Sequence, residues 1–458
     1  MIYVSHPGTL SIVIPVEKDR LGELSTYLEG AGEDSSPWMQ AFERLGTIHF
    51  ARWVLIPESE DGVYGPLLAF ESNHDGSQDE QLRDLVTELG PEIDALLRHC
   101  EGYPQSKTPP TYGSRLAFLE QHVNSHVSPY RAHPNLEVDR IRKDIELRTK
   151  IGAFVETERR AGRLPASPVE IHRAVKDHAF GALKDLDPTP HDRDLPTPLA
   201  LYIRAGILVL LVALVAGVSL GEAFSLGRGG IALATAGSAL GILALAFAVY
   251  LIFRAFVISV EKGEEATADA VRAKVIDEPD KQMAAIFYWE DQQTQNALTH
   301  LVPVKADWRR RLILTVMLFA VRFLAATYYT QGKLGPIDSI HCARWIRIDG
   351  GKRLLFFSNY DGSWESYLGE FVDKLAYWLT AVWSNTEEFP TTRDMFHSGA
   401  ADEEWFKRWT RKHQLYTHVW YSAYPNTSVQ NVLANAALRE GLSKNLTDKE
   451  LRAWLRLL

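Results

Sequence analysis

Two long apolar stretches stand out in this chain against segments that mix apolar and polar positions. The first runs from 199 to 221 with Arg204 as its charged residue, and the second runs from 229 to 253 without a charge before Arg254. Each can cross the hydrocarbon core of a bilayer, which takes about 20 helical residues. Because only a few residues join them, the pattern predicts a two-helix transmembrane hairpin. A buried hairpin of a soluble protein is the alternative.

The charges around the hairpin predict its orientation. The segment 1–7 has no basic region followed by an apolar one, so we expect no signal peptide, and both flanking parts lie on one side of the membrane. Basic residues gather at the outer ends of the hairpin, whereas the loop holds Arg228 alone. Under the positive-inside rule this predicts a multi-pass protein of the inner (cytoplasmic) membrane whose soluble domains face the cytoplasm.

The parts on either side of the hairpin repeat one another. The matched segments, in the same order, are Leu10–Val16 with Leu298–Val304, Ile48–Trp53 with Ile340–Trp345, Leu67–Ser77 with Leu354–Ser363 (one residue fewer), Tyr103–Pro104 with Phe389–Pro390, and Tyr130–Val138 with Tyr421–Val429. Ordered matches of this kind indicate an internal duplication.

Each copy predicts the order strand, helix, strand, strand, helix, strand. In the first copy the strands fall at 10–16, 48–56, 66–71 and 127–132, and the helices at 18–45 and 79–100. The predicted class is α+β, with two ferredoxin-like βαββαβ repeats packed sheet to sheet. The predicted domains are repeat 1 with trailing helices (1–180), a linker (181–198), the transmembrane hairpin (199–257), a helical connector (258–290) and repeat 2 (291–458).

The first helix of the second repeat is unusually apolar. It covers Leu312–Tyr329 and follows Trp308 and Arg309–Arg311. A membrane crossing here would separate two strands of one repeat. We therefore expect its outer face to rest on lipid or on the hairpin, with Trp308 and the arginines at the level of the headgroups. A helix buried between the repeats is the alternative.

Composition narrows the classes of function. The 458 residues carry a net charge of −9 with a pI of about 5.9, which gives no basic surface for nucleic acid. The two cysteines, Cys100 and Cys342, exclude a disulfide framework and a cysteine zinc site, and fit a reducing compartment. No zinc-protease, Walker, nucleophile-elbow or dinucleotide motif is present.

Matching strands carry a histidine and an arginine in both repeats. The candidate catalytic residues are His49, Arg52 and Asp75 in the first repeat and His341, Arg344 and Asp361 in the second. Alternation places each histidine on the strand face of the neighbouring Ala and Trp, and each arginine on the other face. The pairs could serve as proton shuttle and as clamp for an anion or peroxide. Alternatively they are structural, with each arginine holding the nearby aspartate.

The tandem plan resembles the dimeric α/β-barrel superfamily, and within it the two-unit layout of dye-decolorising peroxidases and chlorite-dismutase-like haem proteins. The Asp361-Gly362 pair is similar to the end of the dye-decolorising signature, and the run Ser358–Tyr367 is similar to one in a bacterial membrane-anchored family. The resemblance implies a haem-dependent, peroxidase-like oxidoreductase.

Two further histidines are candidates for binding a cofactor. His300 replaces Ile12 of the first repeat on the apolar face of its strand, where its ring needs either a hydrogen bond or a metal. Under the haem hypothesis His300 is the axial ligand and His418 a second candidate. The alternative is a hydrogen-bonded core histidine.

Two classes of function follow. The first is a membrane-anchored oxidoreductase that takes an apolar or lipid-derived substrate in a pocket between the repeats. The second is a non-catalytic membrane protein whose duplicated domain binds lipid or a partner protein. The expected partners are the lipid bilayer, an apolar or lipid small molecule and, in a homo-oligomer, further copies of the chain, but no nucleic acid.

Overall fold

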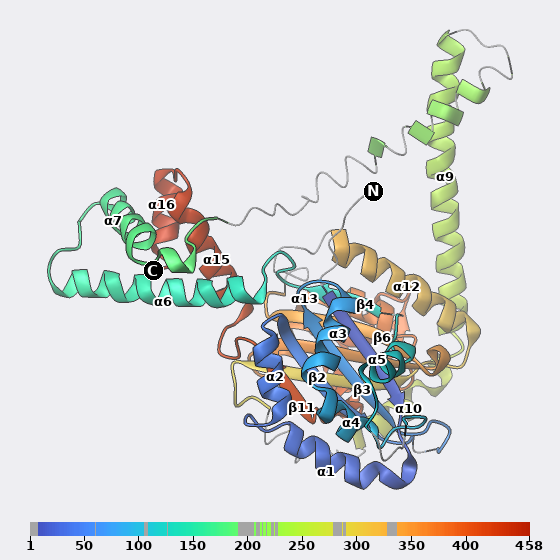
Figure 1. Ribbon diagram of the computed structural model, residues 1–458. Helices are drawn as coiled ribbons and strands as arrows, with labels where there is room; N and C mark the ends of the chain where they lie inside the picture. The colour runs from blue at the N-terminus through green and yellow to red at the C-terminus, as the bar shows by residue number, and fades with distance from the viewer. Residues whose placement is uncertain are drawn as a thin grey trace.

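The computed structural model contains two large antiparallel sheets, a helical arm and one long projecting helix (Figure 1). It describes residues 8–59, 61–104, 109–125, 127–190, 228–277, 286, 290–327 and 337–458, together with 206–207, 211–212, 214–216, 218–220 and 224. The combination of helices with antiparallel strands confirms the α+β class.

The first sheet is built mainly from the first repeat. Its order is β1-β3-β2-β11, with β1 at Gly8–Pro15, β2 at Ile48–Ile56, β3 at Leu67–His74 and β11 at Val419–Ser422. Five helices pack on its outer face, namely α1 (Leu21–Ala31), α2 (Pro37–Leu45), α3 (Gln78–Glu88), α4 (Gly90–Leu97) and α5 (Tyr112–Gln121). Ser36 and Ser77 begin α2 and α3 as N-caps, because their hydroxyls accept backbone N–H groups of the first turn.

The second sheet is built mainly from the second repeat. Its order is β10-β5-β7-β6-β4, with β4 at Val127–Arg131, β5 at Gln295–Pro303, β6 at Ile340–Ile348, β7 at Arg353–Asp361 and β10 at Gln414–Leu415. Its outer face is covered by α12 (Trp308–Thr327), α13 (Trp364–Trp383) and α14 (Glu403–Lys412). A small hairpin of β8 (Thr392–Arg393) and β9 (His397–Ser398) follows α13.

The repeats exchange their fourth strands. β4 belongs to the first repeat along the chain but pairs with β6, whereas β11 belongs to the second repeat and pairs with β2. The exchange is symmetrical, because Tyr130 stands opposite Ala343 and Tyr421 stands opposite Ala51. The sequence predicts that each of these strands closes its own repeat, and that prediction is wrong. Each sheet is therefore completed by the other repeat.

The strand ladders align the two repeats residue by residue. Arg52 stands opposite Glu71, and Arg344 stands opposite Phe357. Glu71 and Phe357 therefore occupy the same position, and the third pair of matched segments aligns without a gap. The sequence comparison pairs Leu67 with Leu354 and therefore needs a deletion of one residue. The ladders pair Leu68 with Leu354, and no deletion is needed.

The two sheets face each other across an apolar layer. Four side chains come from the first sheet (Val54, Ile56, Leu67 and Ala69) and four from the second (Ile346, Ile348, Leu355 and Phe357). The helices lie on the outer faces, so the order of layers is helix, sheet, sheet, helix. The predicted packing of sheet against sheet is present.

A helical arm extends from the body and has its own core. It consists of α6 (Val138–Arg160), α7 (Pro168–Ala182), α15 (Val429–Ser443) and α16 (Asp448–Leu455), and Figure 1 shows it beside the sheets. Its core holds nine buried apolar residues, among them Leu147, Val175, Leu438 and Trp454. Arg439 of α15 forms a buried ion pair with Asp144 of α6. The arm therefore joins helices from both repeats.

One long apolar helix rises from the opposite side of the body (Figure 1). This helix, α9 (Arg228–Glu261), exposes large apolar side chains from Leu233 to Ile252 and is the one described helix that is long and apolar enough to cross a membrane. The first expected span, 199–221, lies largely outside the described residues, as does part of the linker. In the predicted connector, α10 (Ala268–Asp277) packs on α14.

Candidate functional site

Arg52 and Arg344 meet between the sheets and share the carboxylate of Glu71. Arg52 Nε lies 2.7 Å from one oxygen of Glu71, and Arg344 Nε lies 3.1 Å from the other. All three side chains are buried. Burial lowers the pKa of both guanidinium groups, and the charge of Glu71 opposes that shift. The partner of both arginines is thus Glu71, and not Asp75 or Asp361 as one interpretation of the sequence predicts.

The other N–H groups of each arginine bind the opposite sheet. The backbone acceptors are the carbonyl oxygens of Leu298 and Ser358 for Arg52 and those of Leu10 and Ser72 for Arg344, at 2.8 to 3.0 Å. Each arginine also donates to an asparagine side chain, Asn359 or Asn73. Because these donors are used inside the protein, the contacts favour the structural interpretation over an anion or peroxide clamp.

A β-bulge sets the direction of each candidate histidine. His49 and His341 are the extra residues where the pairing of β2 with β3 and of β6 with β7 shifts by one. A bulge interrupts the alternation of side chains along a strand. Trp53 packs on Phe70 beneath the helices, whereas the His49 ring contacts Tyr424. The expectation that each histidine shares the face of the nearby tryptophan is therefore wrong.

His49 connects Asp75 with Tyr424. Its Nε2 lies 2.9 Å from Asp75 Oδ1, and its Nδ1 lies 2.7 Å from the hydroxyl oxygen of Tyr424. Burial lowers the pKa of His49 to about 4, the charge of Arg131 adds to this shift, and Asp75 opposes it. Arg131 Nη2 also contacts Nε2, so this ring atom meets a donor and an acceptor, and the neutral ring accepts from Tyr424 or from Arg131 according to which nitrogen carries the proton.

The second repeat holds a matching pair. His341 Nε2 lies 2.7 Å from Asp361 Oδ1, and the amide nitrogen of Gln295 lies 3.3 Å from the same ring atom. Gln295 also donates to the backbone carbonyls of Tyr424 and Thr427. These hydrogen-bonding groups around His341 all belong to the second repeat, whereas His49 reaches Tyr424 of the other repeat.

Both aspartates bind the first residue of a helix in the arm. Asp75 Oδ2 accepts the N–H of Val138 at 2.8 Å, where α6 begins, and Asp361 Oδ2 accepts that of Val429 at 2.7 Å, where α15 begins. The glycine that follows each aspartate has a positive φ, +81° or +77°. This conformation favours glycine and explains why Asp-Gly occurs at the same turn in both copies.

Two residues that the sequence analysis missed, His133 and Tyr424, bring the histidine pairs together. The His133 ring lies 6.2 Å from that of His49 and 5.9 Å from that of His341. Its Nε2 is 3.3 Å from the Tyr424 hydroxyl. His133 and Tyr424 hold the same position in the two copies. The match of 130–138 with 421–429 could therefore have pointed to both residues. All four rings are buried, which favours a role in joining the repeats.

His300 lies apart from this cluster. Its ring is enclosed by Trp409, Trp383 and His413, with ring centroids at 4.6, 5.1 and 5.9 Å. Burial and the neighbouring His413 hold its pKa well below the usual range, and the Trp409 backbone opposes this only in part. The packed indoles leave no space for a haem, so His300 does not fit the role of axial ligand. Among the described residues no group of three or more His, Cys, Asp or Glu is arranged to hold a metal ion.

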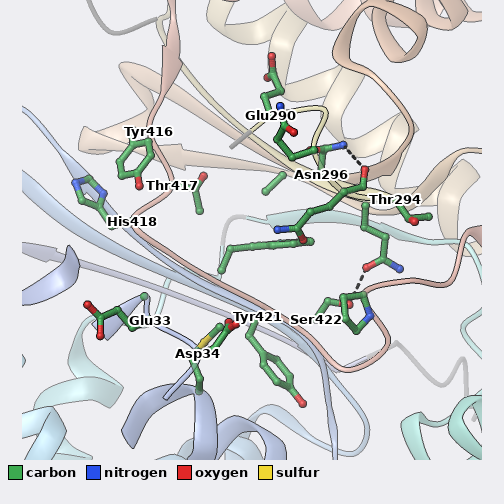
Figure 2. A pocket seen from close by; sticks show the side chains of 18 of the residues that line it. Glu33, Asp34, Glu290, Thr294, Asn296, Tyr416, Thr417, His418, Tyr421 and Ser422 are labelled. Carbon is green, nitrogen blue, oxygen red and sulfur yellow. Dashed lines mark hydrogen bonds between the residues drawn. The ribbon is translucent and has the colours of Figure 1, made fainter. Parts of the chain in front are cut away.

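A groove of about 1170 Å³ opens between the repeats. One wall comes from α1 and the turn that follows it, including Glu33 and Asp34, and Figure 2 shows Glu290 and Asn296 across the space. The segment that leads into β11, together with β11, completes the lining with Tyr416, Thr417, His418, Tyr421 and Ser422. The groove therefore needs both repeats for its walls.

The lining of the groove carries an excess of carboxylates. Glu43 pairs with Arg142 at 2.6 Å, and Glu290 pairs with Arg411 at the same distance. Three further carboxylates, those of Glu29, Glu33 and Asp34, are exposed in the groove and form no ion pair within the described part of the chain. Arg44, the basic residue of the lining, pairs with Glu88 on α3. The groove is therefore negative and suited to a positively charged ligand.

His418 is the sequence candidate that lies in the groove. Its Nδ1 accepts the backbone N–H of Leu55 at 3.4 Å, and burial lowers its pKa to about 4. The carboxylates nearby would repel the propionates of a haem, so the groove does not fit that group either. Because Nδ1 accepts a hydrogen bond, the neutral ring carries its proton on Nε2 and donates from that atom.

Comparison of the chain with family models, with curated proteins and with solved structures gave no match.

Proposed function

We propose that the protein is a non-catalytic, membrane-anchored binding protein whose groove receives a basic, extended segment of a partner protein. The observation that carries the proposal is the negative groove between the repeats, with Glu29, Glu33 and Asp34 available for positive charge. Its volume exceeds the roughly 300 to 1,000 Å³ of pockets for small ligands. The exposed amide and hydroxyl groups of its lining, those of Gln292, Gln293 and Thr294, suit a backbone more than an apolar substrate.

The anchor forms part of the same proposal. We infer that α9 crosses the inner membrane together with the segment 199–221, as a hairpin, and that the soluble parts face the cytoplasm. The exposed apolar surface of α9 supports the crossing, and Arg204 and Arg254 at the outer ends, against Arg228 alone in the loop, support the orientation. We further propose that the two units are ferredoxin-like repeats that have exchanged their closing strands.

A binding assay with a defined peptide tests the groove. The full-length protein in nanodiscs is titrated into a fluorescent peptide of alternating lysine and serine, and anisotropy is recorded at low and high salt. A peptide of alternating glutamate and serine serves as the negative probe. We expect the basic peptide to bind and to weaken at high salt, because exposed charges are screened. Equal binding of both peptides would contradict the proposal.

A matched pair of variants locates the binding. Glu33→Lys with Asp34→Lys reverses two charges in the groove, whereas Asp84→Lys with Glu120→Lys reverses two exposed charges on α3 and α5, away from it. We expect the first variant to lose about tenfold in affinity, roughly 1.4 kcal/mol, and the second to change little. The same loss in both would show that net charge, and not the groove, attracts the peptide.

A further inference from the structure

The outer face of α12 is apolar, aromatic and exposed. The exposed fraction is 67% for Trp308, 71% for Phe319 and 51% for Phe323, and Leu312 and Val316 lie between them. Steps of three and four residues place all five side chains on one side of a helix. We call this set the α12 face. A patch of large apolar side chains of this kind marks an interaction surface.

The opposite side of α12 is fixed in the core. Ile313, Leu314, Met317 and Leu318 are buried against the second sheet and α13. The helix therefore cannot turn its apolar outer face inward without losing this packing. The alternative from the sequence, a helix buried between the repeats, is wrong, because the α12 face is open and the sheets themselves meet between the repeats.

The α12 face is continuous with the base of α9. The rings of Trp308 and Phe256 lie 6.0 Å apart. Figure 1 shows α12 at the foot of α9, on the side of the body from which α9 rises. On α13, Tyr377 and Trp378 are also exposed, next to the β8–β9 hairpin that contacts α9. The apolar surface thus surrounds the point where α9 leaves the body.

Charged contacts hold α12 and α9 in a fixed relation. Arg310 of α12 is fully buried and binds Glu264, just beyond α9, with two hydrogen bonds of 2.9 and 2.7 Å. Lys305 binds the same carboxylate at 2.8 Å. Glu261, the last residue of α9, accepts the N–H of Met395 at 2.7 Å. A bilayer crossed by α9 therefore meets α12 at a set depth.

We propose that α12 lies in the membrane interface, with its exposed face inserted at the boundary between headgroups and acyl chains. The proposal rests on the membrane anchor stated above, and it adds a second contact that fixes how the soluble body sits on the bilayer. Tryptophan and phenylalanine on one side of a helix parallel to the membrane suit this boundary. The continuity with α9 identifies the occupant of the face as lipid.

Depth-dependent quenching tests the proposal in the full-length chain. An environment-sensitive fluorophore is attached at Phe319→Cys, at Leu243→Cys in the middle of α9, and at Glu23→Cys on α1 as a solvent control. Cys100 and Cys342 are buried, and the unmodified protein gives the labelling background. Each sample is placed in phosphatidylcholine nanodiscs with doxyl groups either near the headgroup or deep in the acyl chain.

We expect the label at 319 to be quenched most by the shallow doxyl lipid, the label at 243 most by the deep one, and the label at 23 by neither. Quenching at 243 without quenching at 319 overturns the α12 proposal and leaves the anchor intact. Absence of quenching at 243 overturns the anchor, and the α12 proposal with it. Circular dichroism of each labelled variant shows that it is folded, and Phe323→Cys repeats the measurement one turn further along the face.

Discussion

In the first repeat Arg52 stands opposite Glu71, whereas in the second Arg344 stands opposite Phe357. The two arginines occupy equal positions, yet there is one carboxylate for both. Arg52 also lies over the Phe357 ring, with its guanidinium carbon 5.1 Å from the ring centroid. A buried charge must be paired or hydrogen-bonded. The two repeats thus share one buried cluster of Arg52, Arg344 and Glu71, and Arg344 has its carboxylate partner in the other repeat.

The helices on the outer faces of the two repeats also differ. The first repeat has α1 and α2 in the place where the second has the single long α12. Carboxylates of α1 and its following turn, such as Glu29 and Glu33, line the groove, whereas Trp308 and Phe319 of α12 are exposed apolar side chains. The two sheets share their internal contacts, whereas the surface helices differ, with exposed carboxylates in one copy and exposed apolar side chains in the other.

The largest effect is expected from removing the shared carboxylate. Glu71→Gln leaves two buried guanidinium groups without a counter-charge. Breaking a buried ion pair by removing one partner costs about 3 to 5 kcal/mol. We expect a loss of this size in the free energy of unfolding, measured by denaturant titration of the detergent-purified protein.

The matched position of the second repeat provides the control for this variant. Phe357→Leu changes packing in the apolar layer between the sheets but removes no charge, so we expect a loss of about 1 to 2 kcal/mol. A loss for Glu71→Gln no larger than that for Phe357→Leu would mean that the backbone carbonyls alone satisfy the arginines.

Acid is expected to weaken the first repeat through His49. Its pKa in the folded protein is about 4, below the usual 6.5, so the unfolded chain binds the proton more readily between these values. Stability therefore falls as the pH drops from 6.5 toward 4, by about 3 kcal/mol for a shift of this size. His49→Gln should flatten the profile of unfolding free energy against pH in this window.

In His49→Gln the unfolding free energy should still depend on pH, because burial also lowers the pKa of His74, to about 3. His397→Gln removes an exposed imidazole of the second repeat and is the control. An unchanged slope for His49→Gln would mean that His49 does not titrate with the fold.

Much of the fold can be predicted from matched segments, because strands and helices of a duplicated unit repeat their apolar spacing. The strands around Ile48 and Ile340, the N-cap at Ser77 and the two-sided character of α12 follow from local pattern. The exchange of β4 and β11 could not be predicted in this way, because strand pairing is decided by contacts far apart in the sequence.

Part of the candidate site could also be predicted from the matched segments. Repetition singled out His49, Arg52 and Asp75, but the partner of Arg52 is Glu71, a residue that occurs in one copy only. The β-bulge at His49 also left no clear trace in the apolar pattern. A pocket between the repeats was expected, but its lining could not be foreseen, since the walls come from α1 and from segments near 290 and 420.

A smaller effect on the free energy of unfolding is expected when Asp75 or Asp361 is replaced, and the two losses should differ. Asp75 contacts Arg131 at 3.3 Å in addition to its histidine and helix, whereas among the described residues no arginine forms an ion pair with Asp361. Burial by itself raises the pKa of Asp75, but His49, Arg131 and the Val138 N–H together lower it. We expect Asp75→Asn to cost about 2 kcal/mol and Asp361→Asn about 1 kcal/mol in unfolding free energy. Equal losses would mean that the arginine contributes nothing.

The smallest effect concerns the helices that follow these aspartates. Ser77 forms a capping box at the start of α3, because its hydroxyl accepts the Glu80 N–H and the Glu80 carboxylate accepts the Ser77 N–H at 3.0 Å. Ser363 at the start of α13 accepts the Ser366 N–H at 3.2 Å, with no glutamate to return the bond. We expect Ser77→Ala to cost about 1 kcal/mol and Ser363→Ala about 0.5 kcal/mol. Thermal unfolding of both variants and of the parent protein shows which substitution lowers the stability more. A larger loss of stability for Ser363→Ala would show that the long helix α13 depends more on its first turn than α3 does.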